Sequence, residues 1–371
     1  MEFLEAPNSW ETLPFELAAS RITARTGKIK AGDYKGAGAA PIVDQGKEII
    51  AGYTDNLDAV IRTPLPLIIF GDHTRNIKYV DFPFAVGADG VVLLRPDPKL
   101  NPRFFFYWMQ SLRLHNLGYS RHFKLLQEQQ IAFPADPDEQ QRIVARIEAQ
   151  TSRIEEMRKA QRELETELRG ILHGYYAEII ADVEWKPLAE VAPQVRRPVS
   201  VEAGQSYPEL GIRSFGKGTF HKPAITAEQL GSKRIYHIHP GDLIFNNVFG
   251  WEGAVAVVKP EDAGRVGSHR FITCVPKPKL ATAPFLYFHF TTEQGLHDLG
   301  DASPGGAGRN RTLGLTKLAA IKVPVPDYDK QVVFACIWEK AQEICRLQDD
   351  LSADLNAYVP ALLAKAFRGE L

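Results

Sequence analysis

The chain has 371 residues, of which 44% are hydrophobic and 24% are charged. At about 150 residues per domain, this length predicts more than one domain, and the composition is that of a globular protein. No apolar run reaches the roughly 20 residues of a membrane span. The N-terminus lacks the layout of a signal peptide, and Cys274, Cys336 and Cys345 are too few for a disulfide framework. We therefore expect a soluble cytoplasmic protein.

Charge is balanced overall, with 44 basic and 45 acidic residues, which argues against a general nucleic-acid binder. Its distribution along the chain is uneven. Residues 181–326 carry 17 basic and 13 acidic residues, whereas residues 137–180 carry 7 and 9 and residues 327–371 carry 5 and 8. A neutral total can therefore hide a basic surface.

Residues 1–136 contain short apolar runs separated by Gly and Pro, among them 67–70 and 90–94. Such runs predict strands, and residues 102–114 predict a short helix between them. We expect an α/β domain over 1–136.

Residues 137–180 read as one long helix. It opens with Asp136-Pro137-Asp138-Glu139, which supplies an N-cap, a proline in the first turn and a capping-box glutamate. From Ile143 onward, the seam positions alternate in steps of four and three, a heptad pattern that includes Ile147, Ile154 and Leu164.

Residues 181–326 repeat the plan of residues 1–136. VGADGVVLLRPDPKLNPRFFFY (86–107) matches VGSHRFITCVPKPKLATAPFLY (266–287) at an offset of 180 residues. Trp10 and Trp185 match at an offset of 175, and Gln141 and Gln331 at 190. Matches that keep the same order indicate a duplicated domain, so we expect a second α/β domain over 181–326.

Residues 327–371 form the second long helix, whose predicted seam includes Ile337, Ile344 and Leu351 with one extra step of four. Each helix could lie on its own domain. We instead expect the two helices to pair with each other, because the stripes are longer than a domain of this size. The fold class is therefore α+β: two α/β domains in a pseudo-twofold arrangement, joined by two long antiparallel helices that form a coiled coil.

A search for catalytic motifs gives none. The sequence has no P-loop, no HExxH and no GxSxG, and the glycine-rich residues 36–39 lack the rest of a dinucleotide fingerprint. His237 and His239 alternate on a predicted strand but have no third ligand nearby in the sequence. We predict no catalytic residue and no metal site.

Several loops are rich in the side chains that read base edges and phosphates, and they fall at matched places in the two copies. Arginine pairs with guanine and asparagine with adenine, while serine, threonine and lysine hold phosphates. Any one such loop is more often simply a solvated surface loop. The predicted DNA-binding residues are His73, Thr74, Arg75, Asn76, Lys78, Arg121, His122, Lys124, Arg213, Ser214, Lys217, Asn246, Asn247, His269, Arg270, Arg309, Asn310 and Arg311.

The chain resembles the specificity (S) subunit of type I restriction–modification systems. The resemblance rests on FPADPDEQQRIV (133–144), on the closing LLAKAFRGEL (362–371), and on GDLIF (241–245) and FGDHT (70–74). The second helix departs from the family pattern, because Asp329-Lys330-Gln331-Val332 replaces its Glu-Gln-x-x entry.

The resemblance implies two target-recognition domains, 1–136 and 181–326, each reading half of a split double-stranded DNA sequence. The helices 137–180 and 327–371 are then conserved spacers. It also implies two modification subunits that methylate adenine with S-adenosylmethionine, and restriction subunits that use ATP and Mg²⁺, with no cofactor in this chain. Three alternatives remain open: a self-contained nuclease or methyltransferase, a coiled-coil tether without DNA specificity, and the recognition subunit of a related phage-defence system.

Overall fold

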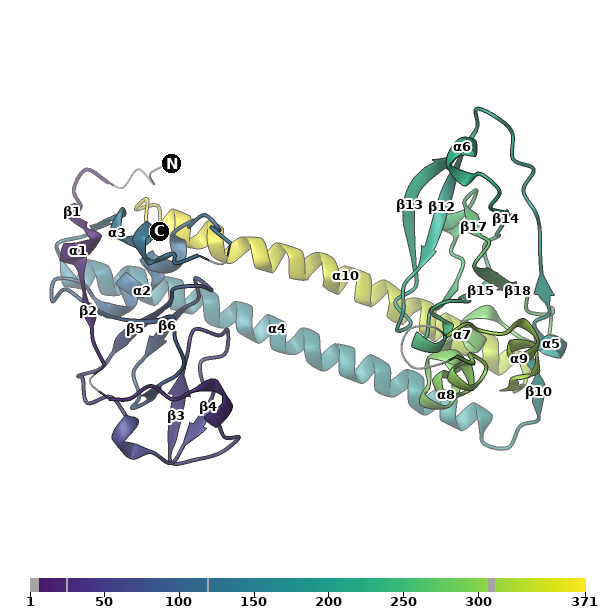
Figure 1. Ribbon diagram of the computed structural model, residues 1–371, viewed down its shortest axis with the longest axis horizontal. Helices are drawn as coiled ribbons and strands as arrows, with labels where there is room; N and C mark the ends of the chain where they lie inside the picture. Colours follow the sequence, from purple (N-terminus) through teal and green to yellow (C-terminus); the bar gives the residue numbers. More distant parts are fainter. Residues whose placement is uncertain (1–6, 25, 119, 306–310) are drawn as a thin grey trace. The chain divides into compact units, whose positions relative to one another are not determined.

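The computed structural model describes residues 7–24, 26–118, 120–305 and 311–371. The fold is of the α+β class, with small sheets, short helices and two long helices (Figure 1). The chain divides into two compact units. The first comprises residues 1–161 and 348–371, and the second comprises residues 162–347. Each unit therefore holds one predicted α/β domain together with a part of both long helices.

The first unit contains three small sheets. One pairs two strands in the order β1-β9, one has the order β2-β8-β5-β6, and one has the order β4-β3-β7. The strands are β1 (Glu11–Pro14), β2 (Ala19–Ile22), β3 (Ala40–Val43), β4 (Gly52–Thr54), β5 (Leu67–Gly71), β6 (Ile77–Val80), β7 (Ala85–Val86), β8 (Val91–Pro96) and β9 (Gln130–Phe133).

Short helices cover the sheet that contains β5. Helix α2 begins after Asn101, whose side chain accepts hydrogen bonds from the amides of Arg103 and Phe104. Its buried ring Phe104 packs edge-on against Phe367, from the far end of the chain, with ring centroids 5.1 Å apart. The short helices of this unit are α1 (Phe15–Ala18), α2 (Pro102–Ser111) and α3 (Phe123–Gln127).

The second unit repeats this plan. Its sheets have the orders β10-β19, β11-β18-β15-β16 and β13-β12-β17-β14. The strands are β10 (Trp185–Pro187), β11 (Gln194–Val195), β12 (Ser206–Ile212), β13 (Thr219–Thr226), β14 (Ile235–His237), β15 (Leu243–Asn246), β16 (Val255–Val257), β17 (Val266–Ser268), β18 (Phe271–Cys274) and β19 (Lys322–Pro324). The helices are α5 (Leu188–Val191), α6 (Ala227–Leu230), α7 (Ala283–Thr291), α8 (Glu293–Asp301) and α9 (Leu315–Ala320).

The strand pairs of the two units correspond residue by residue. Phe70 of β5 lies opposite Val92, and Phe245 of β15 lies opposite Ile272, at the offsets of 175 and 180 that the sequence indicates. One parallel pair also recurs, β3 with β7 in the first unit and β12 with β17 in the second. The second copy differs mainly by its longer β12–β13 hairpin and by the added edge strand β14.

Each long helix is anchored by a buried glutamine near its start. The side-chain amide of Gln140 donates to the backbone carbonyls of Lys99 and Pro134, and its Oε1 accepts from the backbone amide of Asn101. Gln331 makes the same three kinds of bond, to Leu280, Pro326 and Thr282. The counterpart of Gln331 is therefore Gln140, and the sequence match to the exposed Gln141 is wrong by one residue.

The long helices are α4 (Pro137–Ile180) and α10 (Tyr328–Ala366). Of the predicted seam, Ile147 and Ile154 are buried and Ile337 and Ile344 are half-buried. The prediction that Leu164 and Leu351 belong to the seam is wrong, because their exposed fractions are 38% and 43%. The buried and half-buried positions of α10 that alternate in steps of three and four are Gln331, Phe334, Trp338, Ala341, Cys345, Gln348, Ser352, Leu355, Val359, Leu362 and Ala366.

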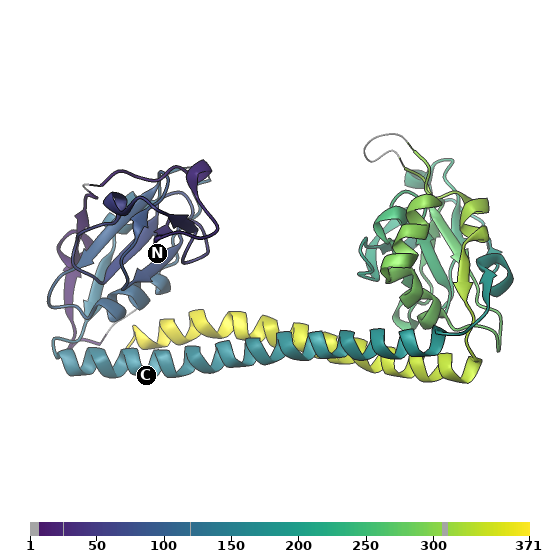
Figure 2. The same cartoon turned by 90° about the horizontal axis from the view of Figure 1, so that it is seen from below.

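Within each unit the two helices pair antiparallel (Figure 2). In the first unit, Gln161 and Gln348 donate to each other's backbone carbonyls at 3.2 and 3.3 Å, and Arg158 donates to Asn356 at 2.9 Å. In the second unit, Tyr175 stacks on Phe334. The predicted antiparallel pairing is confirmed, although part of its contact is polar. Among the residues that the structure describes, no helix is long and apolar enough to cross a membrane.

Candidate nucleic-acid interface

In the first unit, one residue at the end of β5 connects three loops. The Asp72 amide donates to the carbonyl of Gly90, in the turn between β7 and β8, at 2.7 Å. The Asp72 carbonyl accepts from the amide of His122 at 2.8 Å. The predicted segments 73–78 and 120–124 therefore lie beside each other.

Asn247 does the same in the second unit. Its amide donates to the carbonyl of Arg270 at 2.8 Å, and its carbonyl accepts from the amide of Leu313 at 2.7 Å. The offsets of the three residues from Asp72, Gly90 and His122 are 175, 180 and 191; the first two are those of the sequence repeat, and the third is that between Gln140 and Gln331. The folded chain thus brings the predicted loops together in each unit, on the same backbone frame.

The side chain of Asp72 strengthens the frame of the first unit. Its Oδ1 accepts from the amide of Phe123 at 2.8 Å, and its Oδ2 lies 3.9 Å from Nε of Arg121. His122 is fully buried, with Nε2 accepting from the amide of Leu117 at 3.0 Å and Nδ1 bound to the Asp72 carbonyl at 2.9 Å. The structure does not support His122 as a DNA contact, because its ring is used within the fold.

Segment 73–76 is held by Gln45. The Thr74 hydroxyl and the Asn76 side-chain amide both donate to the backbone carbonyl of Gln45, at 2.6 and 2.9 Å. The backbone amide of His73 donates to Gln45 Oε1 at 3.2 Å. Arg75 has a φ of 62°, and its guanidinium donates to the carbonyl of Leu114 at 2.9 Å. This turn is therefore preorganised, and part of its hydrogen-bonding capacity is already used.

Lys78 does not fit the predicted role. Its side chain is 3% exposed, and its Nζ lies 3.5 Å from Oδ1 of Asp44 and donates to the carbonyl of Glu48. Burial lowers the pKa of Lys78, although Asp44 opposes this shift. Because the ammonium faces the protein, the prediction that Lys78 contacts DNA is wrong, and we assign it a structural role. Thr74, Arg121 and Lys124 are exposed, the Arg121 side chain by 83%.

In the second unit, the turn between β12 and β13 carries three predicted residues. Arg213 and Lys217 are exposed. Arg213 donates to the carbonyl of Thr219 at 2.7 Å and lies over the ring of Phe220, 4.9 Å from its centroid. The Ser214 hydroxyl donates to Oε2 of Glu252 at 3.0 Å, which anchors the turn to its neighbour.

The remaining predicted residues surround Asn247. His269 and Arg270 are exposed in the turn between β17 and β18. Asn246 caps its own turn, since its Oδ1 accepts from the amide of Val248 at 3.0 Å. Exposed Arg311 lies over Trp251, 5.4 Å from the ring centroid. Arg309 and Asn310 lie outside the described residues.

Sequence reasoning missed Asp72, Gln45 and the aromatic rings among these loops, and it assigned Asn247 to DNA contact without its role in holding the loops. Asp72 and Asn247 occupy matched places after matched strands, so the offset of 175 could have revealed this shared role. Gln45 had no signal in the sequence. Trp251 and Phe215 were passed over because only polar side chains were counted.

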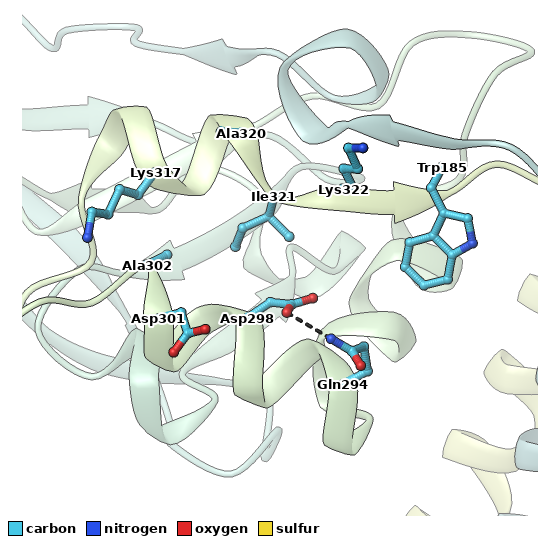
Figure 3. A pocket seen from close by; sticks show the side chains of 9 residues that line it. All are labelled: Trp185, Gln294, Asp298, Asp301, Ala302, Lys317, Ala320, Ile321 and Lys322. Carbon is cyan, nitrogen blue, oxygen red and sulfur yellow. Dashed lines mark hydrogen bonds between the residues drawn. The ribbon is translucent and has the colours of Figure 1, made fainter.

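A separate pocket of about 520 Å³ lies between α8 and the segment formed by α9 and β19 (Figure 3). Its lining brings Trp185, two carboxylates and two lysines to one hollow: the carboxylates are Asp298 and Asp301, and the lysines are Lys317 and Lys322. Asp298 accepts a hydrogen bond from Gln294 at 2.9 Å. None of the predicted DNA-binding residues that the structure describes in this unit lines the pocket.

Beneath Trp185 lies a buried histidine. His289 Nδ1 is 2.7 Å from the hydroxyl of Tyr176, while its Nε2 is buried and has no hydrogen-bond partner within the described ranges. The indole of Trp185 packs edge-on against this ring, with centroids 5.5 Å apart. Burial lowers the pKa of His289 to about 4, so the ring is neutral near pH 7. This histidine belongs to the core around α7.

Metal ligands were also sought in the structure. No group of three or more His, Cys, Asp or Glu side chains in its described part is placed to hold a metal ion. His237 and His239 therefore stay without a third ligand in that part of the chain.

Comparison with known proteins shows one relationship in sequence and several in fold. No family model matches the chain. Over 180 residues it is 27% identical to the Type I restriction enzyme EcoR124I/EcoR124II specificity subunit of Escherichia coli, a match covering 44% of this chain and 43% of that protein. The match thus spans less than half of the curated relative.

Two solved structures share the fold. A chain from a structure on the complex assembly and conformational transition of the type I R-M system has a TM-score of 0.60 at 17% identity, covering 99% of both chains. The type I restriction–modification S subunit from M. genitalium has a TM-score of 0.56 at 15% identity, covering 96% of both. The resemblance that the sequence indicated is confirmed: the chain is similar in sequence to one specificity subunit and shares the fold of another.

Proposed function

We propose that this chain, whose sequence and fold resemble those of type I specificity subunits, is the DNA sequence-specificity subunit of a restriction–modification complex. Each unit would read one half of a bipartite double-stranded target. The observation that carries the proposal is the repeated frame around Asp72 and Asn247, beside which each unit exposes basic side chains, Arg121 and Lys124 in the first and Arg270 and Arg311 in the second.

The chemistry of these loops supports DNA as the ligand. Exposed Arg121 precedes helix α3, Lys124 lies in the first turn of that helix, and exposed Arg270 lies in the turn between β17 and β18; backbone hydrogen bonds fix these segments. Guanidinium groups can pair with guanine edges or with phosphates. Because the loops are already ordered, little conformational entropy is lost when DNA binds. Preorganised cationic loops therefore favour sequence reading over loose charge attraction.

The chain itself would be non-catalytic. Two modification subunits would bring S-adenosylmethionine for adenine methylation, and restriction subunits would bring ATP- and Mg²⁺-dependent cleavage. This division of labour is supported by the sequence, which has neither a P-loop nor a complete dinucleotide fingerprint. We place the reaction in the cytoplasm, where the DNA and these partners would meet.

Helices α4 and α10 would act as the spacer that sets the unread gap between half-sites. Seven residues inserted near the exposed Glu156 preserve the heptad phase. They lengthen the helix by about 10 Å at 1.5 Å per residue. At 3.4 Å per base pair, that corresponds to about three base pairs.

The test is to map methylated adenines in cells that carry this chain with its modification subunits. We expect a bipartite site whose gap grows by about three base pairs in the insertion variant while both half-sites keep their sequences. A seven-residue insertion after Arg368, beyond the end of α10, serves as the control and should leave the gap unchanged. Methylation without a bipartite site would refute the proposed function, and altered half-site sequences would refute the separation of reading from spacing.

A further inference from the structure

The turn between β12 and β13 exposes an aromatic ring to an unusual degree. Phe215 is 72% exposed, the highest fraction among the large apolar side chains that the structure describes as exposed. Burying a phenylalanine ring is favourable by its apolar area, so most rings of this chain are inside. A ring left in solvent at a loop tip suits a contact that forms only on binding.

The backbone of Phe215 is held in a conformation that disfavours a bulky residue. Its φ is 62°, in the left-handed region, and neighbouring Gly216 and Gly218 have φ values of 60° and 73°. A third glycine would fit position 215 with less strain, because only glycine enters this region freely. The fold therefore carries a steric cost to display this ring, a feature that is concentrated at functional sites.

Four hydrogen bonds hold the turn in place. The Phe215 amide donates to the carbonyl of Glu252 at 2.7 Å, and the Gly216 amide donates to Gly253 at 3.0 Å. Ser214 binds the Glu252 carboxylate, and the Tyr287 hydroxyl donates to the carbonyl of Gly216 at 2.6 Å. A turn fixed from both sides holds its exposed ring in a constant place.

Positive charge surrounds the ring. Exposed Arg213 and Lys217 flank it in the same turn. Exposed Arg311 lies over Trp251, in the same 3₁₀ turn (Gly250–Glu252) whose last residue accepts from Phe215. The Glu252 carboxylate accepts the Ser214 hydroxyl, so its charge is partly compensated. An apolar ring within a cationic rim matches a duplex, which presents stacked bases between two lines of phosphates.

We infer that Phe215 is a wedge that presses on one base-pair step of the half-site read by the second unit. This inference rests on the proposed function and adds a specificity-determining residue to it. Apolar wedges of this kind partly unstack a step, and flexible pyrimidine–purine steps unstack most easily. Phe215 would thus select for a deformable step without a hydrogen bond to any base.

The experiment uses the chain assembled with its modification subunits and a duplex carrying the mapped bipartite site. 2-Aminopurine replaces one base at a time across both half-sites, because its fluorescence rises when its neighbours unstack. We expect a rise at one step of the second half-site with the wild-type chain. This rise in fluorescence should be lost in Phe215→Ala and kept in part in Phe215→Leu. Phe215→Ala should also bind the duplex with about a 10-fold lower affinity.

Two variants control for folding and for loss of exposed apolar surface. Phe215→Gly removes the ring and relieves the positive φ, so it should lose the fluorescence signal while keeping the thermal stability of the wild type. Leu57→Ala, at a side chain that is 62% exposed in the first unit, should change neither signal nor affinity.

The remaining outcomes separate this inference from the proposed function. Site-specific binding and methylation without a fluorescence rise at any step would overturn the wedge and leave the proposed function standing. Loss of subunit assembly in Phe215→Ala, with unstacking unchanged, would assign the ring to a protein interface instead. If the complex binds without preference for a bipartite site, both the proposed function and the wedge fail.

Discussion

The two loop clusters share a backbone frame but fill it differently. In the first unit the residue after the central strand is Asp72, whose carboxylate accepts an amide hydrogen bond from the next helix and faces Arg121. In the second unit it is Asn247, whose Oδ1 is buried and has no hydrogen-bond partner among the residues that the structure describes. The first cluster is braced by its side chains and the second adds exposed rings. Duplication thus preserved the backbone bonds that place the loops while their side chains diverged.

The largest expected effect tests whether the two units are built alike at the helix starts. Gln140→Ala and Gln331→Ala each remove three buried hydrogen bonds and leave backbone groups without partners. Each should lower the free energy of unfolding of its own unit by about 4 kcal/mol. Hydrogen exchange followed by mass spectrometry, which resolves the two units, measures both losses.

Gln141→Ala is the matched control, because this exposed side chain makes one hydrogen bond, to Asn101. It should cost less than about 1 kcal/mol. If only one of the two buried glutamines proves important, the helix entries are not equivalent.

The next effect is a pH dependence confined to the second unit. The folded pKa of His289, about 4, lies below its usual 6.5. The unfolded chain therefore binds the proton first as pH falls, and stability is lost between about pH 6.5 and 4. At 1.36 kcal/mol per pKa unit, the loss approaches about 3 kcal/mol. Urea denaturation at several pH values, followed by tryptophan fluorescence, measures it.

His289→Phe should flatten this profile, since the variant has no group to protonate at that position. His173→Phe changes an exposed histidine that packs against Phe288 and should leave the profile as it is. An unchanged profile in His289→Phe would assign the acid sensitivity to other groups.

A smaller effect distinguishes the two frames directly. Asp72→Ala removes the acceptor of the Phe123 amide and should destabilise the first cluster by about 2 kcal/mol. Asn247→Ala removes an oxygen that has no hydrogen-bond partner in the described part of the chain, so it should cost under about 1 kcal/mol. Thermal unfolding and exchange of the Phe123 amide measure the difference. Equal losses in the two variants would show that the carboxylate does not brace the first cluster.

The smallest effect concerns the proposed reading of DNA. Arg121→Ala should weaken discrimination in one half-site, and Arg270→Ala in the other, each by about fivefold at a single base pair. Competition binding by the assembled complex, with single substitutions in each half-site, measures both. If either variant altered both halves, the two units would not read independently.

Much of this fold could be predicted from the sequence, because a duplication and two long amphipathic helices leave strong patterns. The seam of α10 could not, since apolar residues alone select Leu351, whereas Gln348 and Ser352 occupy the buried face. Of the predicted DNA-binding residues, His122 and Lys78 are buried within the fold, and DNA contact by the others stays a prediction. Whether a lysine such as Lys78 faces solvent depends on a carboxylate 34 residues earlier in the sequence, which no local pattern shows.

The composition of the first unit has a consequence for how the chain is made. Its core includes Leu363, Ala366 and Phe367, which are synthesised last, whereas the second unit is a continuous stretch of chain. On the ribosome, the second unit can complete its core while the first unit still lacks the core residues that the end of the chain supplies. The N-terminal domain, although translated first, must then wait with Phe104 uncovered until the final helix emerges. Premature termination near residue 350 would therefore spare the later-made unit and expose the earlier one to chaperones and proteases.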